Sequence, residues 1–125
     1  MNVTGKLSVR RVADAQPRTH NNVTARPLFD RRNDPFRSSL SYCWYTTIVA
    51  GEANAAHVHD DIEKIYYILG GSAHIVCGDD AGDVTPGDAF FFPAQVEHSI
   101  ANTGDSELQM LVYASKILPL EGSAT

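Results

Sequence analysis

The sequence predicts an all-β protein, because short strand-like segments follow one another along the chain with turn residues between them. Residues 40–50, 65–69 and 108–117 are dense in aromatic, aliphatic and β-branched side chains, and glycine, proline, asparagine and aspartate separate such segments. No stretch has the apolar period of a convincing amphipathic helix, and no internal repeat occurs. Short strands at this spacing are typical of a β-barrel or a β-sandwich.

The chain of 125 residues is the size of one domain with one core. It contains no apolar run approaching the ~20 residues of a membrane span, and its N-terminal region lacks the hydrophobic segment of a secretory signal. We therefore expect a cytoplasmic protein with no membrane partner. Cys43 and Cys77 do not have the spacing of a metal-binding pair, so we expect two buried, reduced thiols.

Charge is divided unevenly along the chain. Residues 1–40 contain eight of the ten basic residues and only three acidic ones, a net charge of +5, so the rest of the chain carries −10. The arginines are scattered, without interleaved aromatic residues or a nucleic-acid-binding motif, so we expect no nucleic-acid partner. Residues 1–39 are rich in proline, asparagine and arginine without a clear period. They predict an irregular arm that packs on the barrel or on a partner subunit.

The segment 40–50 is apolar or small on both of its faces. Alternate residues such as Trp44 and Tyr45 point to opposite faces of a strand, and neither set is polar. A strand at a monomer's surface normally has a polar outer face, so we expect the arm or a second subunit to cover this one. A homodimer is the favoured explanation.

Turn residues mark the ends of the later strands. Gly70-Gly71 predicts a hairpin before a returning strand at 72–78, and Pro86-Gly87 fits a type II turn. The three phenylalanines at 90–92 indicate a buried strand. A polar turn at 102–107 then precedes the last long strand.

Histidines and one carboxylate form the candidate functional site. His57 and His59 are two residues apart, so on an extended strand their imidazoles share one face, about 7 Å apart along the backbone. Glu63 follows a polar bend at Asp60-Asp61 and opens the next strand, where its carboxylate can reach the same ion. His98 begins another extended run and supplies a third imidazole if the chain returns beside the first pair.

Two spaced motifs resemble those of the cupin superfamily. Gly51, His57, His59, Glu63 and Gly70 have the spacing of the first cupin motif at every fixed position. The resemblance extends through a second motif, so it covers residues 51–102. It implies a double-stranded β-helix, the jelly-roll barrel, over residues 40–118, with a metal in its mouth and a C-terminal tail at 119–125.

The second motif is similar to the family's with one departure. Gly87, Pro93, His98 and Asn102 have the expected spacing, but Gln95 stands where the family usually has glycine. Glycine adopts positive φ at lower cost than glutamine. The departure therefore affects the loop before His98 and removes no ligand.

The resemblance implies one divalent transition metal per subunit, held by His57, His59, Glu63 and His98. Three imidazoles and one carboxylate suit Fe, Mn, Ni, Co or Zn better than Mg or Ca. Four protein ligands leave two positions of an octahedral ion open. Those positions permit either redox chemistry with O₂ or Lewis-acid chemistry.

Glu63 and Tyr67 are the candidate catalytic residues. Glu63 could accept a proton from the substrate if it moved partly off the ion. Strand alternation from Glu63 predicts that Ile65, Tyr67 and Leu69 also face inward, which makes the Tyr67 hydroxyl a candidate proton donor in the cavity.

Similarity to small single-domain cupins implies a metal-dependent enzyme that acts on a small oxygenated organic substrate, and a dioxygenase-type oxygenase is the first expectation. A non-redox isomerase, lyase or cyclase is the alternative, and a metal-containing module that only binds a small ligand is the second alternative. The complete ligand set favours an enzyme, because a binding module does not need open coordination positions. The fold itself does not decide among these activities.

Overall fold

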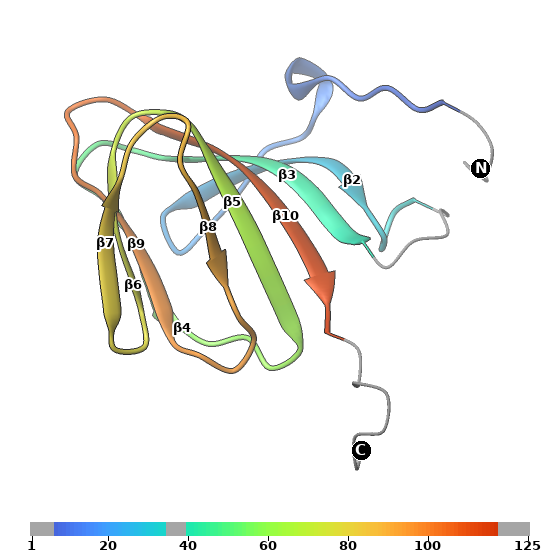
Figure 1. Cartoon of the computed structure of the whole chain (residues 1–125). Coiled ribbons are helices and arrows are strands. Elements are labelled where there is room, and N and C mark those ends of the chain that lie inside the picture. The colour runs from blue at the N-terminus through green and yellow to red at the C-terminus, as the bar shows by residue number, and fades with distance from the viewer. Residues whose placement is uncertain (1–6, 35–39, 118–125) are drawn as a thin grey trace, which may run out of the picture.

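The computed structural model describes residues 7–34 and 40–117 and contains two antiparallel β-sheets that face each other (Figure 1). The larger sheet has six strands in the order β1-β2-β3-β10-β5-β8, and the smaller has four in the order β4-β9-β6-β7. The predicted all-β jelly roll is confirmed, whereas the tail predicted at 119–125 lies outside the described residues. The strands are β1 (Arg18–His20), β2 (Val23–Asp30), β3 (Leu40–Ile48), β4 (Ala53–His57), β5 (Ile62–Gly70), β6 (Ala73–Cys77), β7 (Asp80–Val84), β8 (Ala89–Phe92), β9 (His98–Asn102) and β10 (Leu108–Lys116).

Helical structure is minimal in the described part of the chain. It consists of one 3-10 turn, η1 (Val12–Asp14), ahead of β1. None of the described residues belongs to a helix of the length and apolar character that a membrane span requires. Cys43 and Cys77 are free thiols, half-buried rather than fully buried as the sequence predicted.

The core lies between the two sheets and draws on the central strands of both. Seven large side chains in it are at most 2% exposed. Burying one such side chain contributes roughly 1.5–3 kcal/mol relative to leaving it in water. These contacts fix the strands that carry the site against one another. The seven are Ile48, Ile68, Phe92, Ile100, Leu108, Met110 and Val112.

The side chains of β5 that face inward are the alternate set to the one predicted. Tyr66 and Ile68 are buried, while Ile65, Tyr67 and Leu69 are 44–48% exposed on the outer face. The prediction that Ile65, Tyr67 and Leu69 face inward is therefore wrong. Both sets of side chains are apolar, so hydrophobicity did not distinguish them, and the Asp60-Asp61 bend breaks the alternation that begins at the histidines.

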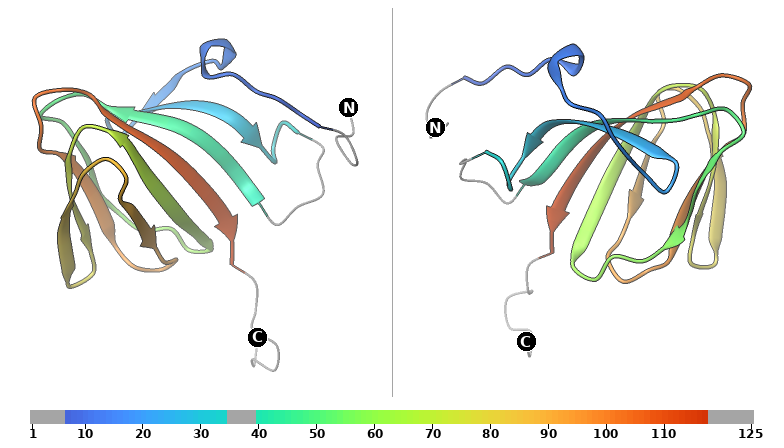
Figure 2. Two further views of the ribbon diagram at one scale, coloured as in Figure 1. Left: turned by 45° about the horizontal axis from the view of Figure 1, so that its top comes forward. Right: turned by 180° about the vertical axis from the view of Figure 1, so that it is seen from behind.

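The N-terminal segment is more regular than the sequence predicted. β1 and β2 form an antiparallel hairpin, and β2 pairs with β3, so residues 18–30 extend the larger sheet (Figure 2). Asn21 and Asn22 make the turn with φ of 49° and 65°, which are the positive values that a type I′ hairpin turn requires. The expectation of an irregular arm thus fails for 18–30, although the segment does pack on the barrel.

The hairpin lies beside β3 in the sheet and does not cover the outer face of β3. The outward side chains Cys43, Tyr45 and Thr47 are half-buried, and their partners in β10 are Tyr113, Leu111 and Gln109. The inward side chains Tyr42 and Trp44 line a cavity between the sheets. The N-terminal hairpin therefore does not cover the outer face of β3, and we still expect a second subunit to cover it.

Candidate metal centre

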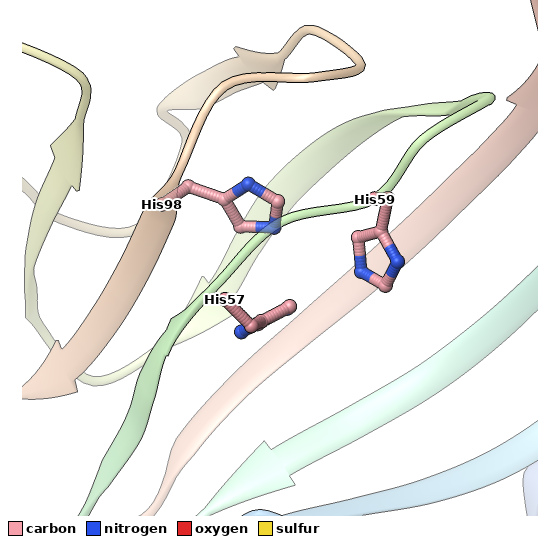
Figure 3. Close-up of side chains that lie close together, drawn as sticks. All are labelled: His57, His59 and His98. Atoms are coloured by element: carbon pink, nitrogen blue, oxygen red, sulfur yellow. The ribbon is translucent and has the colours of Figure 1, made fainter.

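Three histidines converge at one end of the smaller sheet (Figure 3). His57 ends β4 and is paired with His98, the first residue of β9, while His59 lies in the segment that leads to β5. One ring nitrogen from each lies within 4.8 Å of the others. The ring centroids are 4.5–5.4 Å apart. The antiparallel pairing of β4 with β9 thus brings His98 beside His57 and His59, as predicted for a chain that returns beside the first pair.

Backbone carbonyl groups fix which nitrogen two of these rings offer. His57 Nδ1 lies 2.8 Å from the carbonyl oxygen of Ala55, and His98 Nδ1 lies 2.9 Å from that of Val96. A carbonyl oxygen only accepts hydrogen bonds, so each Nδ1 must carry the proton and donate it. Each Nε2 then keeps its lone pair for another partner, as in histidine ligands of metal ions.

Two of the ring nitrogens are buried without a partner. His59 Nε2 and His98 Nε2 have no hydrogen bond to any residue that the structure describes, although buried polar atoms in proteins almost always have one. A metal ion bound between the rings would satisfy both atoms, and imidazole nitrogen is a ligand that transition metals prefer. The three histidines therefore fit a metal ion.

The surroundings of His59 and His98 keep these two rings in the neutral form that binds metal ions. Burial, followed by the nearby positive charges of Lys64, His57 and His98, lowers the pKa of His59 from 6.5 to about 4. Burial also lowers the pKa of His98. Metal ions bind neutral imidazole, so neither ring needs to lose a proton before binding at neutral pH.

Glu63 does not join the histidines in this structure. The group that could hold a metal contains no described carboxylate. Ile62 and Lys64 both line the cavity, and Glu63, which lies between them on β5, points to the opposite face. The predicted roles of Glu63 as fourth ligand and as proton acceptor both depended on an inward orientation, which the structure does not show.

Lys64, and not Glu63, is the charged residue of β5 that lines the cavity. Its Nζ atom lies 5.7 Å from the centre of the Tyr42 ring, inside the cavity. Burial lowers the pKa of Lys64 from 10.5 to about 8, so the ammonium is still the main form at pH 7. Side chains alternate between the two faces along β5, so Lys64 could have been predicted to face the cavity if it were known which set points inward.

Tyr67 is likewise absent from the cavity, because it is 44% exposed on the outer face of β5. Its neighbour Tyr66 faces inward and lines the cavity, together with Tyr42. Burial raises the pKa of both inward tyrosines far above the usual value of 10, so their hydroxyls stay protonated. Tyr66 therefore replaces Tyr67 as the tyrosine of this strand that faces the cavity.

The cavity beside the histidines has a volume of about 790 Å³. It opens between the two sheets, and apolar side chains from β2, β3, β5 and β10 form much of its wall. This volume is in the range of sites that bind small organic molecules. Apolar wall residues include Val23, Ala25, Pro27, Trp44, Ile62 and Val112.

Gln95 has the backbone conformation that the family's glycine would have. Its φ is 68°, and its N–H donates a hydrogen bond of 2.7 Å to the carbonyl oxygen of His59. The loop before His98 is thereby tied to the loop that carries His59. The departure from the second motif therefore leaves the loop in place and adds backbone strain at Gln95.

Sequence reasoning missed the contribution of the N-terminal hairpin to the site. The Asn21 side chain donates to the carbonyl oxygen of Ala55 and accepts from its N–H, both at 3.2 Å. Asn22 donates to the carbonyl oxygen of Ala53 at 2.8 Å. The hairpin turn thus binds the free edge of β4 just before His57.

Comparison with known proteins agrees with this architecture. A family model described as "Cupin domain" matches residues 44–113, which include all three histidines and more than half of the chain. The chain belongs to the cupin family. A relative found by sequence, an uncharacterised protein of Methanocaldococcus jannaschii, is 31% identical over 64 residues, which are 51% of each chain. The match to this relative thus spans about half of its length.

Solved structures similar to this cupin show the same fold. A predicted oxalate decarboxylase from Thermotoga maritima has a TM-score of 0.76 at 22% identity, with 88% of this chain and 100% of that chain covered. A Cupin 2 conserved barrel domain protein from Salinispora arenicola has a TM-score of 0.72 at 20% identity, covering 90% and 91%. A variant of Bacillus subtilis oxalate decarboxylase has a TM-score of 0.73 at 24% identity, covering 90% of this cupin and 30% of that chain.

Proposed function

We propose that this cupin is a metal-dependent enzyme in which His57, His59 and His98 hold one divalent transition metal per subunit. The observation that carries the proposal is the pair of buried Nε2 atoms, on His59 and His98, that belong to the histidine cluster and have no hydrogen-bond partner among the described residues. Leaving such atoms unpaired costs about 1–3 kcal/mol each, and a metal ion removes that cost. Fe, Mn, Ni, Co and Zn all suit a site of three imidazoles.

The substrate we propose is a small oxygenated organic molecule bound in the adjoining cavity. When bound, a divalent transition metal would coordinate substrate oxygen atoms and, if it is redox-active, permit electron transfer to O₂. The protein contributes the fixed orientation of the histidines, through the carbonyl oxygens of Ala55 and Val96, and a largely apolar wall that limits access of water.

An oxygenase is the reaction class that we favour. His57, His59 and His98, without a carboxylate, would leave part of the coordination sphere of a bound metal open to oxygen atoms of the substrate and, with a redox-active metal, to O₂. A Lewis-acid reaction, as in an isomerase, lyase or cyclase, needs only part of that room. A module that binds its ligand without turnover is the remaining alternative.

Metal content tests the ligand set. We expect the purified wild-type protein to hold about one transition metal ion per chain, and His59→Ala to retain less than roughly one-tenth of it, because loss of one of three ligands removes most of the affinity. His74→Ala is the matched control, because His74 lies on β6 with its Nδ1 bonded to Asp83 at 2.8 Å, away from the cluster. Full occupancy in His59→Ala would refute the site.

Oxygen uptake tests the reaction class. Protein loaded with Fe, Mn, Ni, Co or Zn is incubated with a panel of enolisable and catechol-like compounds, in air and under strict anaerobic conditions. An oxygenase should turn over only in air and only with a redox-active metal. Anaerobic turnover with Zn would assign the Lewis-acid class, and an absence of turnover with tight ligand binding would assign a binding module.

A further inference from the structure

We propose that the cavity selects a small organic anion, with the carboxylate of the ligand held between the histidine cluster and Lys64. The inference rests on the proposed function in one respect, because it takes the cavity beside the histidines as the substrate site. It goes further by naming the chemical class of the substrate and the residue that recognises it.

Lys64 is a positive charge inside the cavity without a negative partner among the described residues. It is half-buried, and it makes no ion pair with any residue at 7–34 or 40–117. Lys116, the other described lysine, pairs with Asp61 at 3.3 Å. A partly buried ammonium without a counter-charge is unfavourable, and a bound anion would compensate it.

The acidic side chain that lines the cavity cannot fill this role. Asp30 is 2% exposed and is already bonded to its neighbours. Arg32 donates to both of its carboxylate oxygens, at 3.1 and 2.8 Å, and Trp44 Nε1 donates to one of them at 3.2 Å. These bonds hold the pKa of Asp30 below its usual value. The negative charge of Asp30 is therefore already paired with Arg32 and does not compensate Lys64.

A second cation lies at the rim of the same cavity. Arg18 on β1 lines the cavity, is exposed, and forms no ion pair within the described part of the chain. The protein as a whole has a net charge of −5, so the cavity is a local exception to an acidic molecule. Positive charge confined to a concave site attracts anions and raises their local concentration.

A metal ion bound by the histidines would add to the excess of positive charge in the cavity. Three neutral imidazoles bring no negative charge to a divalent ion, and no described carboxylate belongs to their cluster. A carboxylate ligand would neutralise part of the metal charge and the charge of Lys64 at the same time. Opposite charges attract each other more strongly in a partly buried site than in bulk water, because the effective dielectric constant is lower there. The apolar wall then favours an organic body behind the carboxylate.

Cyclohexanecarboxylate and cyclohexanecarboxamide are suitable probes, because they have the same shape and differ in charge. Trp44 is the only tryptophan of the chain and lines the cavity, so its fluorescence reports binding, with calorimetry as a second measurement. In zinc-loaded wild-type protein we expect the carboxylate to bind at least about tenfold more tightly than the amide, which corresponds to about 1.4 kcal/mol.

Substitution of Lys64 assigns the preference to this residue. Lys64→Met should weaken binding of the carboxylate about tenfold and leave binding of the amide unchanged, whereas Lys64→Arg should keep the preference. Unchanged binding of the amide shows that the cavity is intact. Lys116→Met, which removes an exposed lysine outside the cavity, should behave as wild type.

Metal analysis of the same samples separates this inference from the proposed function. If the protein takes up no metal but metal-free protein still prefers the carboxylate through Lys64, the metalloenzyme proposal fails and the anion site stands. If about one metal ion binds per chain and the two probes bind equally, the anion site is refuted and the metal proposal stands. An equal loss of both probes in Lys64→Met and Lys64→Arg would also overturn the role of Lys64.

Discussion

The His59 ring is held neutral by its surroundings, and this makes the metal-free protein sensitive to acid. Its pKa is lowered from 6.5 to about 4, first by burial and then by the charges of Lys64, His57 and His98. An unfolded chain protonates His59 near pH 6.5, whereas the folded chain does so only near pH 4. The unfolded state therefore binds more protons in this window, so the stability of the folded state falls as the pH is lowered through it.

Urea unfolding of metal-free protein at pH 7.5 and pH 5 measures this loss. His59→Gln cannot titrate, so its free energy of unfolding should decrease less between the two pH values than that of the wild type. Asp30 and Asp34 have lowered pKa values and contribute acid sensitivity of their own at lower pH, which the comparison with the variant subtracts. Equal losses in the two proteins would contradict the role of His59.

The positive φ of Gln95 makes it a position where glycine should stabilise the fold. A residue with a Cβ in the left-handed region costs about 1–2 kcal/mol, and Gln95 has a φ of 68°. Gln95→Gly should therefore raise the free energy of unfolding by ~1 kcal/mol, after allowance for the greater freedom of glycine in the unfolded chain. Chemical denaturation measures it. Gln95→Ala keeps the strained backbone and should have the same free energy of unfolding as the wild type. If Gln95→Ala were stabilised as much as Gln95→Gly, backbone strain would not be the cause.

At the scale of residues, the structure brings the three predicted histidines together but does not place Glu63 or Tyr67 beside them. The pairing of His57 with His98 follows from the return of β9 beside β4, and the two motifs located both strands. The sequence did not determine which side chains of β5 face inward, because Tyr66 and Tyr67 are equally suited to a buried face. It depends on pairing with β8 and β10, which no local pattern specifies.

The β1–β2 hairpin, at the end of the larger sheet, is the element that supports the proposed metal site. β4 is an edge strand of the smaller sheet, and the Asn21 side chain occupies its free edge by bonding to both the N–H and the carbonyl oxygen of Ala55. The same carbonyl oxygen accepts the hydrogen bond from His57 Nδ1. The hairpin turn therefore helps to fix the orientation of a proposed metal ligand.

Asn21→Gly tests this support without adding strain, because glycine accepts the φ of 49°. We expect its affinity for Zn or Co to fall about tenfold, since loss of an outer partner of a ligand typically has an effect of that size. Competition with a chelator gives the affinity. Asn22→Gly removes only the bond to Ala53 and should have a smaller effect. Equal affinities for Asn21→Gly and the wild type would show that β4 does not need the hairpin.

The hairpin also shows why the arm was predicted to be irregular. Residues 18–20 and 23–25 are three-residue segments in which only Val23 and the two threonines are typical of strands, so they are too short to show an alternating hydrophobic pattern. Their pairing relies on two asparagines that adopt positive φ and on β3 as a template. The asparagine pair was a usable turn signal, whereas attachment to β3 is a long-range contact.

Across the whole molecule, the outer face of the larger sheet is unusually apolar. The outward orientation of β5 places Ile65 opposite Tyr113 of β10 on one side and opposite Phe91 of β8 on the other, so the three form a row across the sheet. These side chains are 48–51% exposed, and Tyr67 and Leu69 continue the surface along β5. A contiguous apolar face of this kind is typical of a surface that another protein covers.

We expect a second copy of this chain to cover that face. A homodimer was predicted from the two apolar faces of the segment 40–50, and the outward row of β5 now adds to the same side of the sheet. The opposite charges of residues 1–40 and of the rest of the chain are a second, weaker attraction between copies. Light scattering at micromolar concentration and physiological salt should therefore give about twice the monomer mass of 13.6 kDa.

Placing a charge in the row should dissociate the dimer without unfolding the barrel, because the side chains involved do not belong to the core. Ile65→Lys puts an ammonium at the middle of the proposed interface, where it would lose its water, so we expect a monomer mass at the same concentration. Ala81→Lys adds the same charge to the exposed β7 on the other sheet and should remain a dimer. Circular dichroism verifies that both variants are folded. A monomer mass for the wild type, or a dimer that survives Ile65→Lys unchanged, would show that this face is not where two copies meet.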